Sequence, residues 1–92
     1  MPSPFSITLD GLVWLGTRER RGIFRPATVL CPQCNAPLGA LVLESGTHLV
    51  CSSGRAECIA PAKTFANEGE LNAYLDRYWK AVGEACLRRK TL

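Results

Sequence analysis

Four cysteines in the middle of the chain constrain its fold more than any other feature. They have the spacing C-x2-C-x16-C-x6-C and are Cys31, Cys34, Cys51 and Cys58. Two residues between thiolates let one turn direct both sulfurs at a single ion, and four sulfurs form the tetrahedral site that Zn²⁺ occupies in proteins. The spacing therefore predicts one four-cysteine site on two loops, holding one Zn²⁺. Four thiolates leave no open position for water or substrate, so the predicted ion is structural.

Disulfide pairing and thiol redox chemistry are the alternative roles for these cysteines. The total of five cysteines is odd, which does not suit a complete disulfide framework. The segment MPSPFSITLDG lacks the basic and apolar regions of a secretory signal, so we expect a cytoplasmic, reducing location. A thioredoxin-like C-x-x-C is expected before a helix, whereas CPQCNAPLG continues through Pro37 and Gly39 toward a predicted strand. Metal binding is therefore the prediction.

His48 and Cys86 are further candidate ligands. Side chains alternate along a strand, so His48 is expected to point away from the side that carries Cys51. A site in which His48 replaces Cys58 stays open as an alternative. Cys86 falls on the apolar stripe of a predicted helix, which favours a buried thiol. Iron is the alternative metal, but rubredoxin-type sites usually have two short C-x-x-C loops, and the second loop here has six residues between its cysteines.

The segment CPQCNAPL…HLVCSSGRAEC resembles the four-cysteine zinc ribbons at the C-terminal ends of bacterial type I topoisomerases. Those ribbons begin with C-P-x-C-G, pass through a hydrophobic hairpin and close with a wider cysteine pair. The resemblance covers residues 31–58 and implies a zinc-ribbon fold in which the same four cysteines are the metal ligands. Asn35 stands in place of the family's glycine, and the aromatic and basic residues that such ribbons place around the third cysteine are sparse here.

The residues before the cysteines predict a β-hairpin and a further strand. Apolar and polar residues alternate in FSITLDGLVWLG, and Asp10-Gly11 suits a two-residue turn with positive φ. A short helix over residues 11–20 is the alternative, although two glycines disfavour it. The segment IFRPATVL predicts a strand that is broken or lies at a sheet edge, because Pro26 has no N–H to donate.

Two more hairpin strands and a short strand are predicted around the second cysteine pair. ALVLE and THLVC flank Ser45-Gly46, which suits a tight turn, and residues 60–65 suit a short strand. Asn35 and Gly54 are the residues expected to take positive φ in the two cysteine loops.

The C-terminal segment predicts an amphipathic helix over about residues 68–88. Asn67 suits the N-cap, and Glu70 three residues later resembles a capping box. Apolar residues recur at helical spacing; they are Leu71, Tyr74, Leu75, Tyr78, Trp79, Val82, Ala85 and Cys86. This stripe is expected to dock on the rest of the fold.

These elements predict an α+β fold in one domain, residues 1–92. It comprises an N-terminal β region (1–30), a zinc ribbon of β-hairpins (31–66) and a long C-terminal amphipathic helix (67–92). A chain this short buries a limited core, so a metal ion is expected to supplement it. No apolar run approaches the about 18 residues that span a membrane, so no membrane association is predicted. The sequence leaves a dimer open.

The motif content and charge argue against an enzyme and against avid polyanion binding. The nucleotide-binding, nucleophile-elbow and H-E-x-x-H motifs are absent, and the chain has one histidine. We therefore predict that the protein is not an enzyme. Four thiolates and one Zn²⁺ together carry −2, so the formal charge of +3 falls to about +1 when the site is filled.

An arginine-rich stretch contains the candidate partner-binding residues, which are Trp14, Arg18, Arg20, Arg21 and Arg25. Arginine and tryptophan are typical interface anchors, which favours a regulator or inhibitor that docks on a nucleic-acid-handling protein complex. Direct DNA or RNA binding is the alternative, because guanidinium groups contact phosphates while aromatic rings stack on bases. Solvated surface charge also stays open. In size and arginine content the chain resembles phage-encoded host-takeover factors, including anti-CRISPR proteins.

Overall fold

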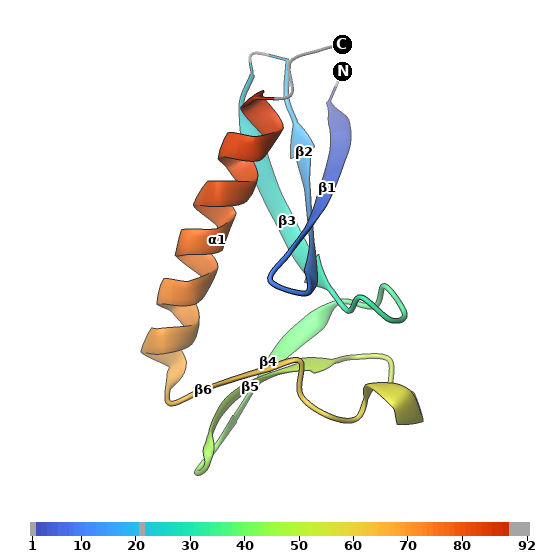
Figure 1. Ribbon diagram of the computed structural model, residues 1–92, viewed down its shortest axis with the longest axis vertical. Coiled ribbons are helices and arrows are strands. Elements are labelled where there is room, and N and C mark those ends of the chain that lie inside the picture. The colour runs from blue at the N-terminus through green and yellow to red at the C-terminus, as the bar shows by residue number, and fades with distance from the viewer. Residues whose placement is uncertain (1, 21, 89–92) are drawn as a thin grey trace.

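The computed structural model describes residues 2–20 and 22–88, which form two three-stranded antiparallel sheets and one long helix (Figure 1). The first sheet has the order β1-β2-β3 and comprises β1 (Ser3–Leu9), β2 (Leu12–Arg18) and β3 (Phe24–Leu30). The second has the order β4-β5-β6 and comprises β4 (Leu38–Leu43), β5 (Gly46–Cys51) and β6 (Lys63–Phe65). A short 3₁₀ helix, η1 (Ala56–Cys58), precedes β6, and α1 (Glu68–Arg88) follows it. The predicted α+β class is confirmed.

The N-terminal hairpin forms as its alternation and turn residues predict, so the alternative helix over residues 11–20 is wrong. Asp10 and Gly11 have φ angles of 54° and 76°, the two positive values that a tight hairpin turn needs. The strands pair in register from Ser3 opposite Arg18 to Leu9 opposite Leu12. β2 is the central strand of the first sheet, and alternate residues along it are buried.

The proline-containing strand β3 lies at a sheet edge, as Pro26 predicts. Its pairing with β2 shifts register between Leu15 and Gly16, and Pro26 then lies opposite Gly16. A Cβ at Gly16 would overlap the Phe24 ring and the Arg25 carbonyl oxygen. The close approach of β2 and β3 at this irregularity therefore requires glycine at position 16.

The second sheet differs from its prediction in detail. The turn residues of the β4–β5 hairpin are Glu44 and Ser45, and Gly46 is already the first residue of β5. The predicted turn at Ser45-Gly46 is thus one residue too late. Gly46 has a φ of 139°, and a Cβ there would lie 2.6 Å from the Phe65 carbonyl oxygen of β6. The predicted strand over residues 60–65 is shorter, because only the last three of these residues pair with β5.

The helix α1 has the predicted bounds, and its cap differs slightly. Asn67 Oδ1 accepts a hydrogen bond from the Glu70 N–H at 2.9 Å, while Glu70 Oε1 accepts one from the Ala66 N–H at 3.2 Å. The reciprocal bond of the capping box therefore reaches one residue earlier than in the standard motif. Within the described ranges no helix combines the length and apolarity that crossing a bilayer would require.

The hydrophobic core lies where α1 covers the first sheet and reaches the second (Figure 1). Its buried members are Leu12, Trp14, Val29, Leu49, Leu71, Tyr74 and Val82. A polar contact joins the same three parts of the molecule: Tyr74 Oη donates to Asp10 Oδ2 at 2.7 Å, and Lys63 Nζ lies 2.9 Å from the same oxygen. The β1–β2 turn, α1 and β6 therefore meet at the Asp10 carboxylate.

Candidate metal centre

The fold brings the four predicted ligands together from two loops. Cys31 directly follows β3, Cys34 lies in the turn before β4, Cys51 ends β5 and Cys58 ends η1. In the first loop the Cys31 N–H donates to the Ala36 carbonyl, and the Asn35 N–H donates to the Cys31 carbonyl, both at 2.8 Å. Asn35 and Gly54 have φ angles of 61° and 75°, as expected for the residues that bend each loop.

The sulfur positions fit a single tetrahedral ion. All four Sγ atoms lie within 4.8 Å of one another. The Sγ–Sγ distance is 3.4 Å for Cys34–Cys51, 3.7 Å for Cys31–Cys58 and 3.8 Å for Cys34–Cys58. Four sulfurs placed 2.3 Å from one Zn²⁺ at tetrahedral angles would be about 3.8 Å apart. The residues present therefore fit a four-thiolate metal site, and the separations are too long for disulfide bonds, whose length is about 2.05 Å.

Two of the thiols have shifted pKa values in opposite directions. The Ser53 hydroxyl is the main cause that lowers the pKa of Cys34 to about 6, with the Ala36 backbone and Cys51 adding to it. Burial is the main cause that raises the pKa of Cys58 to about 12, and the neighbouring Cys31 sulfur raises it further. Without an ion, Cys34 thus favours the thiolate and Cys58 the thiol, so a divalent cation must displace the Cys58 proton on binding.

Two polar residues that were not predicted from the sequence, Ser53 and Gln33, contact the sulfurs. Ser53 Oγ lies 3.1 Å from Cys51 Sγ and 3.5 Å from Cys34 Sγ, and the Ser53 backbone N–H donates to Cys51 Sγ at 3.4 Å. Gln33 Oε1 lies 3.7 Å from Cys58 Sγ. The position of Ser53, two residues after a ligating cysteine, was a usable signal, because the amide there faces back to the sulfur in a tight loop. Such contacts orient metal ligands.

The structure places the other candidate ligands outside the cluster. His48 Nδ1 lies 3.0 Å from Thr64 Oγ1, and its Nε2 lies 3.4 Å from Ser45 Oγ. The expected orientation of His48, away from the Cys51 side of the strand, matches these partners. Cys86 is 1% exposed on the buried face of α1.

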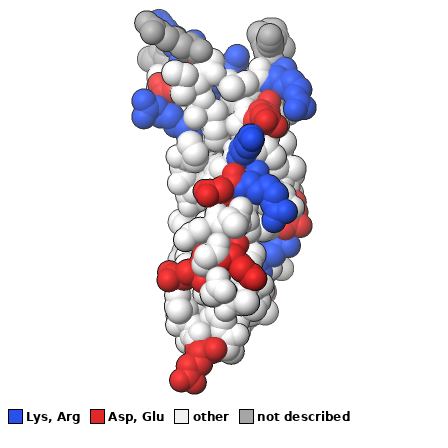
Figure 2. Space-filling view, turned by 90° about the vertical axis from the view of Figure 1, so that its left-hand side faces the viewer, with Lys and Arg blue, Asp and Glu red and all other residues white. Residues whose placement is uncertain are grey.

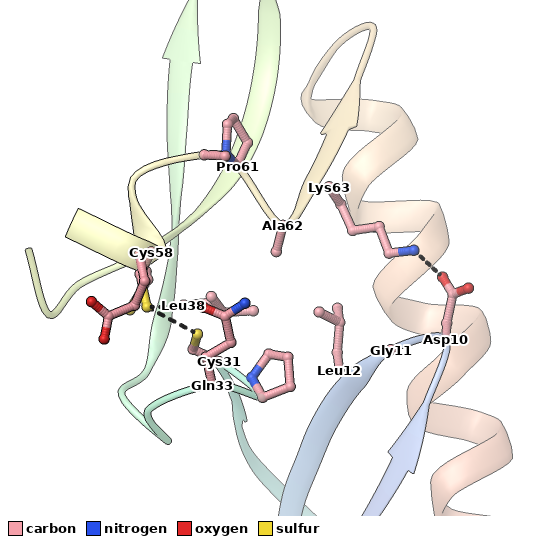
Figure 3. A pocket seen from close by; sticks show the side chains of 14 residues that line it. Asp10, Gly11, Leu12, Cys31, Gln33, Leu38, Cys58, Pro61, Ala62 and Lys63 are labelled. Atoms are coloured by element: carbon pink, nitrogen blue, oxygen red, sulfur yellow. Dashed lines mark hydrogen bonds and ion pairs between the residues drawn. The ribbon is translucent and has the colours of Figure 1, made fainter. Parts of the chain in front are cut away.

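A half-open pocket of about 290 Å³ lies beside the cysteine cluster (Figure 3). Cys31 and Cys58 line one end, and the Asp10–Lys63 ion pair closes the other. Its apolar walls come mainly from Leu12, Leu38, Pro61 and Ala62. The pKa of Asp10 is lowered, first by the Tyr74 hydroxyl and then by Lys63, so the carboxylate stays charged there.

Trp14 does not have the exposed position that a partner-binding anchor needs. Its side chain is fully buried, and its Nε1–H donates to the Leu9 carbonyl at 2.9 Å. The ring stacks on Tyr78 with centroids 5.6 Å apart and meets Trp79 edge-on at 5.0 Å. On the alternating faces of β2, Trp14 points toward α1, which buries it in the core. In this conformation Trp14 is a core residue that a partner cannot reach.

The described arginines of the predicted set gather at one end of the molecule. Arg18 ends β2, Arg20 lies in the β2–β3 connection and Arg25 lies in β3, and the last two are exposed. Arg25 Nε pairs with Glu19 Oε2 at 3.3 Å, and Arg18 Nε is buried without a hydrogen-bond partner among the described residues. Arg21 lies outside the described residues.

The charges on the helix face are unevenly distributed along the long axis (Figure 2). Lys and Arg side chains occur in the upper and middle parts of this face, interspersed with Asp and Glu, and the lowest part carries only Asp and Glu. Glu68 and Glu70 in the first turn of α1 belong to the acidic part. We call Arg18, Arg20, Arg25 and Arg88 the basic end, because β2, β3 and the C-terminus of α1 meet there (Figure 1).

No family model matches the chain, and the searches of curated proteins and of solved structures give no match either. Any functional conclusion therefore depends on the geometry of the four-cysteine cluster and on the surfaces around it.

Proposed function

We propose that this protein is a small, zinc-binding, non-enzymatic interaction protein that docks on a nucleic-acid-handling protein complex as a regulator or inhibitor. The observation that carries the proposal is the closed set of four sulfurs. An ion held by all four cysteines has no free coordination position for a substrate. Such an ion would stabilise the fold and would not be a reaction centre. A surface stiffened in this way loses little conformational freedom when it binds.

The surface between β3 and α1 supports docking at the basic end. Ile23 is 52% exposed and Leu87 is 40% exposed. Both line a shallow apolar groove with Phe24 and Trp79. Arginines beside exposed apolar side chains are typical of interface residues, and Arg25 lies on the strand that borders the groove. Asp76, Lys80 and Glu84 also line the groove, so a matching partner would place apolar side chains over the groove and acidic side chains beside the arginines.

Affinity capture with nuclease treatment tests the proposal. The zinc-loaded protein is expected to retain the same partner proteins before and after nuclease, because the contact is with protein. Leu87→Asp should reduce capture, while Ala73→Asp, an exposed helix position away from the groove, should not. Loss of all partners after nuclease would contradict protein docking.

Direct nucleic-acid binding is a second candidate, favoured by the gathering of four described arginines at one end. Contacts to phosphates should weaken steeply between about 50 and 200 mM salt, because bound counterions are released. Arg20→Glu should then weaken binding, and Arg77→Glu on the middle of α1 changes net charge equally without touching the basic end. No measurable affinity for DNA or RNA at low salt would rule this candidate out.

A further inference from the structure

The strand β4 leaves an unusual apolar edge on the second sheet. It is the edge strand of the order β4-β5-β6. Leu41, Val42 and Leu43 are 44%, 57% and 51% exposed. Leu41 lies opposite His48 on the outer face, and Val42 lies opposite the buried Thr47 on the inner face. Both faces of this edge therefore present apolar side chains to solvent.

The other long edge strands carry protection that β4 lacks. β1 turns polar side chains such as Ser6 and Thr8 outward, and β3 contains Arg25 and Pro26. Charges, prolines and polar faces are the usual means by which proteins prevent edge strands from pairing with another chain. The residues Leu38–Leu43 include no charge and no proline. An edge of this kind is suited to accept another strand.

The free part of the edge is short and well defined. An isolated bridge between Leu30 and Pro37 covers the start of β4, so Gly39 to Leu43 is the open segment within the described chain. A two-residue loop closes the hairpin, so its flanking pair is hydrogen-bonded and backbone direction alternates from there. By this alternation, Ala40 and Val42 direct their N–H and C=O groups toward the open edge.

We propose that β4 pairs antiparallel with β4 of a second copy of this chain, across a two-fold axis at Leu41, to form a continuous six-stranded sheet. In this register Leu41 faces its own counterpart, Ala40 faces Val42, and Gly39 faces Leu43. The alternation gives Ala40 and Val42 the backbone bonds that join the copies. The register uses the open segment in full and leaves the covered residue Leu38 outside it.

The shape and charge of the segment favour a second copy over a foreign strand. Apart from Gly39 itself and its two neighbours in the chain, no atom of the described residues lies within 4 Å of the position that a Cβ of Gly39 would take, so Leu43 of the other copy has room to pack there. A two-fold interface brings the same segment of both copies together, so a charged segment would place like charges opposite each other. The segment Gly39 to Leu43 carries no charge and avoids this repulsion. Five residues extend about 17 Å, so the interface is smaller than the about 1,200 Å² of a stable complex. We therefore expect a weak dimer, with a dissociation constant of tens of micromolar.

Sedimentation equilibrium of the full chain over about 5–500 μM tests the pairing. The wild type should dimerise, and Leu41→Lys should raise the dissociation constant at least about tenfold, because two ammonium groups would face each other. Ala73→Lys is the control: it adds the same charge at an exposed position of α1, away from both β4 and the groove, and should leave dimerisation unchanged. A wild type that is monomeric throughout, or a dimer lost with Ala73→Lys and kept with Leu41→Lys, overturns the proposal.

A mixing experiment tests the register. Leu41→Lys and Leu41→Glu should each be monomeric over most of this range, and an equimolar mixture should form a heterodimer. Complementation is expected because position 41 faces itself across the axis, which brings the opposite charges together. Failure of the mixture to associate, with both variants folded by circular dichroism, overturns the assignment of Leu41 to the axis. The outcome is independent of whether the chain docks on a nucleic-acid-handling complex.

Discussion

Each sulfur of the cluster has a surrounding that suits a metal ligand, and the surroundings are not equivalent. Cys58 is buried, while Cys34 and Cys51 share the Ser53 hydroxyl. Coordination by a divalent cation favours the thiolate form of all four cysteines. This includes Cys58, whose raised pKa favours the thiol when no metal is bound. The individual ligands should therefore not tolerate replacement by a harder, protonated oxygen.

Cys58→Ser is expected to abolish stoichiometric zinc binding, because a serine hydroxyl does not ionise to replace the thiolate. Elemental analysis of purified protein should give one zinc per chain for the wild type and far less for the variant. Cys86→Ala is the control, since Cys86 is a buried core thiol outside the cluster. One zinc per chain in Cys58→Ser, or its loss in Cys86→Ala, would contradict the assigned ligand set.

Tyr74 is expected to resist ionisation at high pH. Burial and the hydrogen bond to the Asp10 carboxylate raise its pKa above the usual value of 10.0. Because the folded pKa is raised, this contribution to stability is complete below pH 10 and is lost as the pH rises through the folded pKa. In an alkaline titration at 295 nm, the last rise in absorbance should belong to Tyr74 and be absent in Tyr74→Phe.

Asp10→Asn separates the two causes of the Tyr74 shift. The variant removes the negative charge beside the phenol, and asparagine keeps the positive φ of this turn position. The last rise in absorbance should then move to lower pH and still remain above the usual value, because the tyrosine stays buried. An unchanged titration would show that Asp10 has no part in the shift.

The pairing of β2 with β3 requires a close backbone approach at Gly16, whereas Gly83 in α1 has room for a side chain. Gly16→Ala should destabilise the fold by about 1–3 kcal/mol, because the added Cβ meets a carbonyl oxygen of β3 that the strand pairing holds in place. Gly83→Ala is the contrasting variant: its Cβ would lie 3.4 Å from Phe24 Cδ2, an ordinary contact, and alanine favours the helix by about 1 kcal/mol.

Urea unfolding of the two glycine variants gives the comparison. The midpoint for Gly16→Ala should fall and the midpoint for Gly83→Ala should rise relative to wild type. Equal midpoints for the two variants would mean that the β2–β3 irregularity relaxes freely and that the close approach is not a structural constraint.

In the whole molecule, the two sheets differ in how much buried apolar surface stabilises them. Most of the buried core comes from β2, β3 and α1, and among the described residues Leu49 is the one buried residue that β5 contributes to the cluster. The second sheet has little apolar burial of its own. We therefore expect it to depend on an ion bound by the four cysteines to offset the conformational entropy of ordering its loops.

Chelation of the metal is expected to loosen the second sheet before the first. Hydrogen exchange after treatment with a strong chelator should show faster exchange for β4 and β5, while β2 and the middle of α1 stay protected. Exchange that is unchanged by the chelator would contradict a structural role for the ion. Faster exchange in β2 than in β5 would contradict the proposed difference between the sheets.

Local sequence signals were sufficient to predict the features that depend on near neighbours. The spacing of the cysteines predicted all four members of the cluster, Asp10-Gly11 predicted the first turn, and the capping residues with the apolar stripe predicted α1 with its bounds. Each of these signals lies within a few residues, because turns, caps and metal loops are shaped by local backbone preferences.

Which surfaces are covered depends on how the sheets and the helix pack together, and local sequence signals did not predict it. The sequence made Trp14 a candidate partner-binding residue, and the packing of α1 buries it in the core. The contact between Tyr74 and Asp10 joins residues 64 positions apart, and no local pattern signals it. The exposure of β4 likewise follows from the tertiary arrangement, in which β4 is an edge strand and α1 packs mainly against the first sheet. Burial depends on contacts between distant segments, whose arrangement local preferences do not encode.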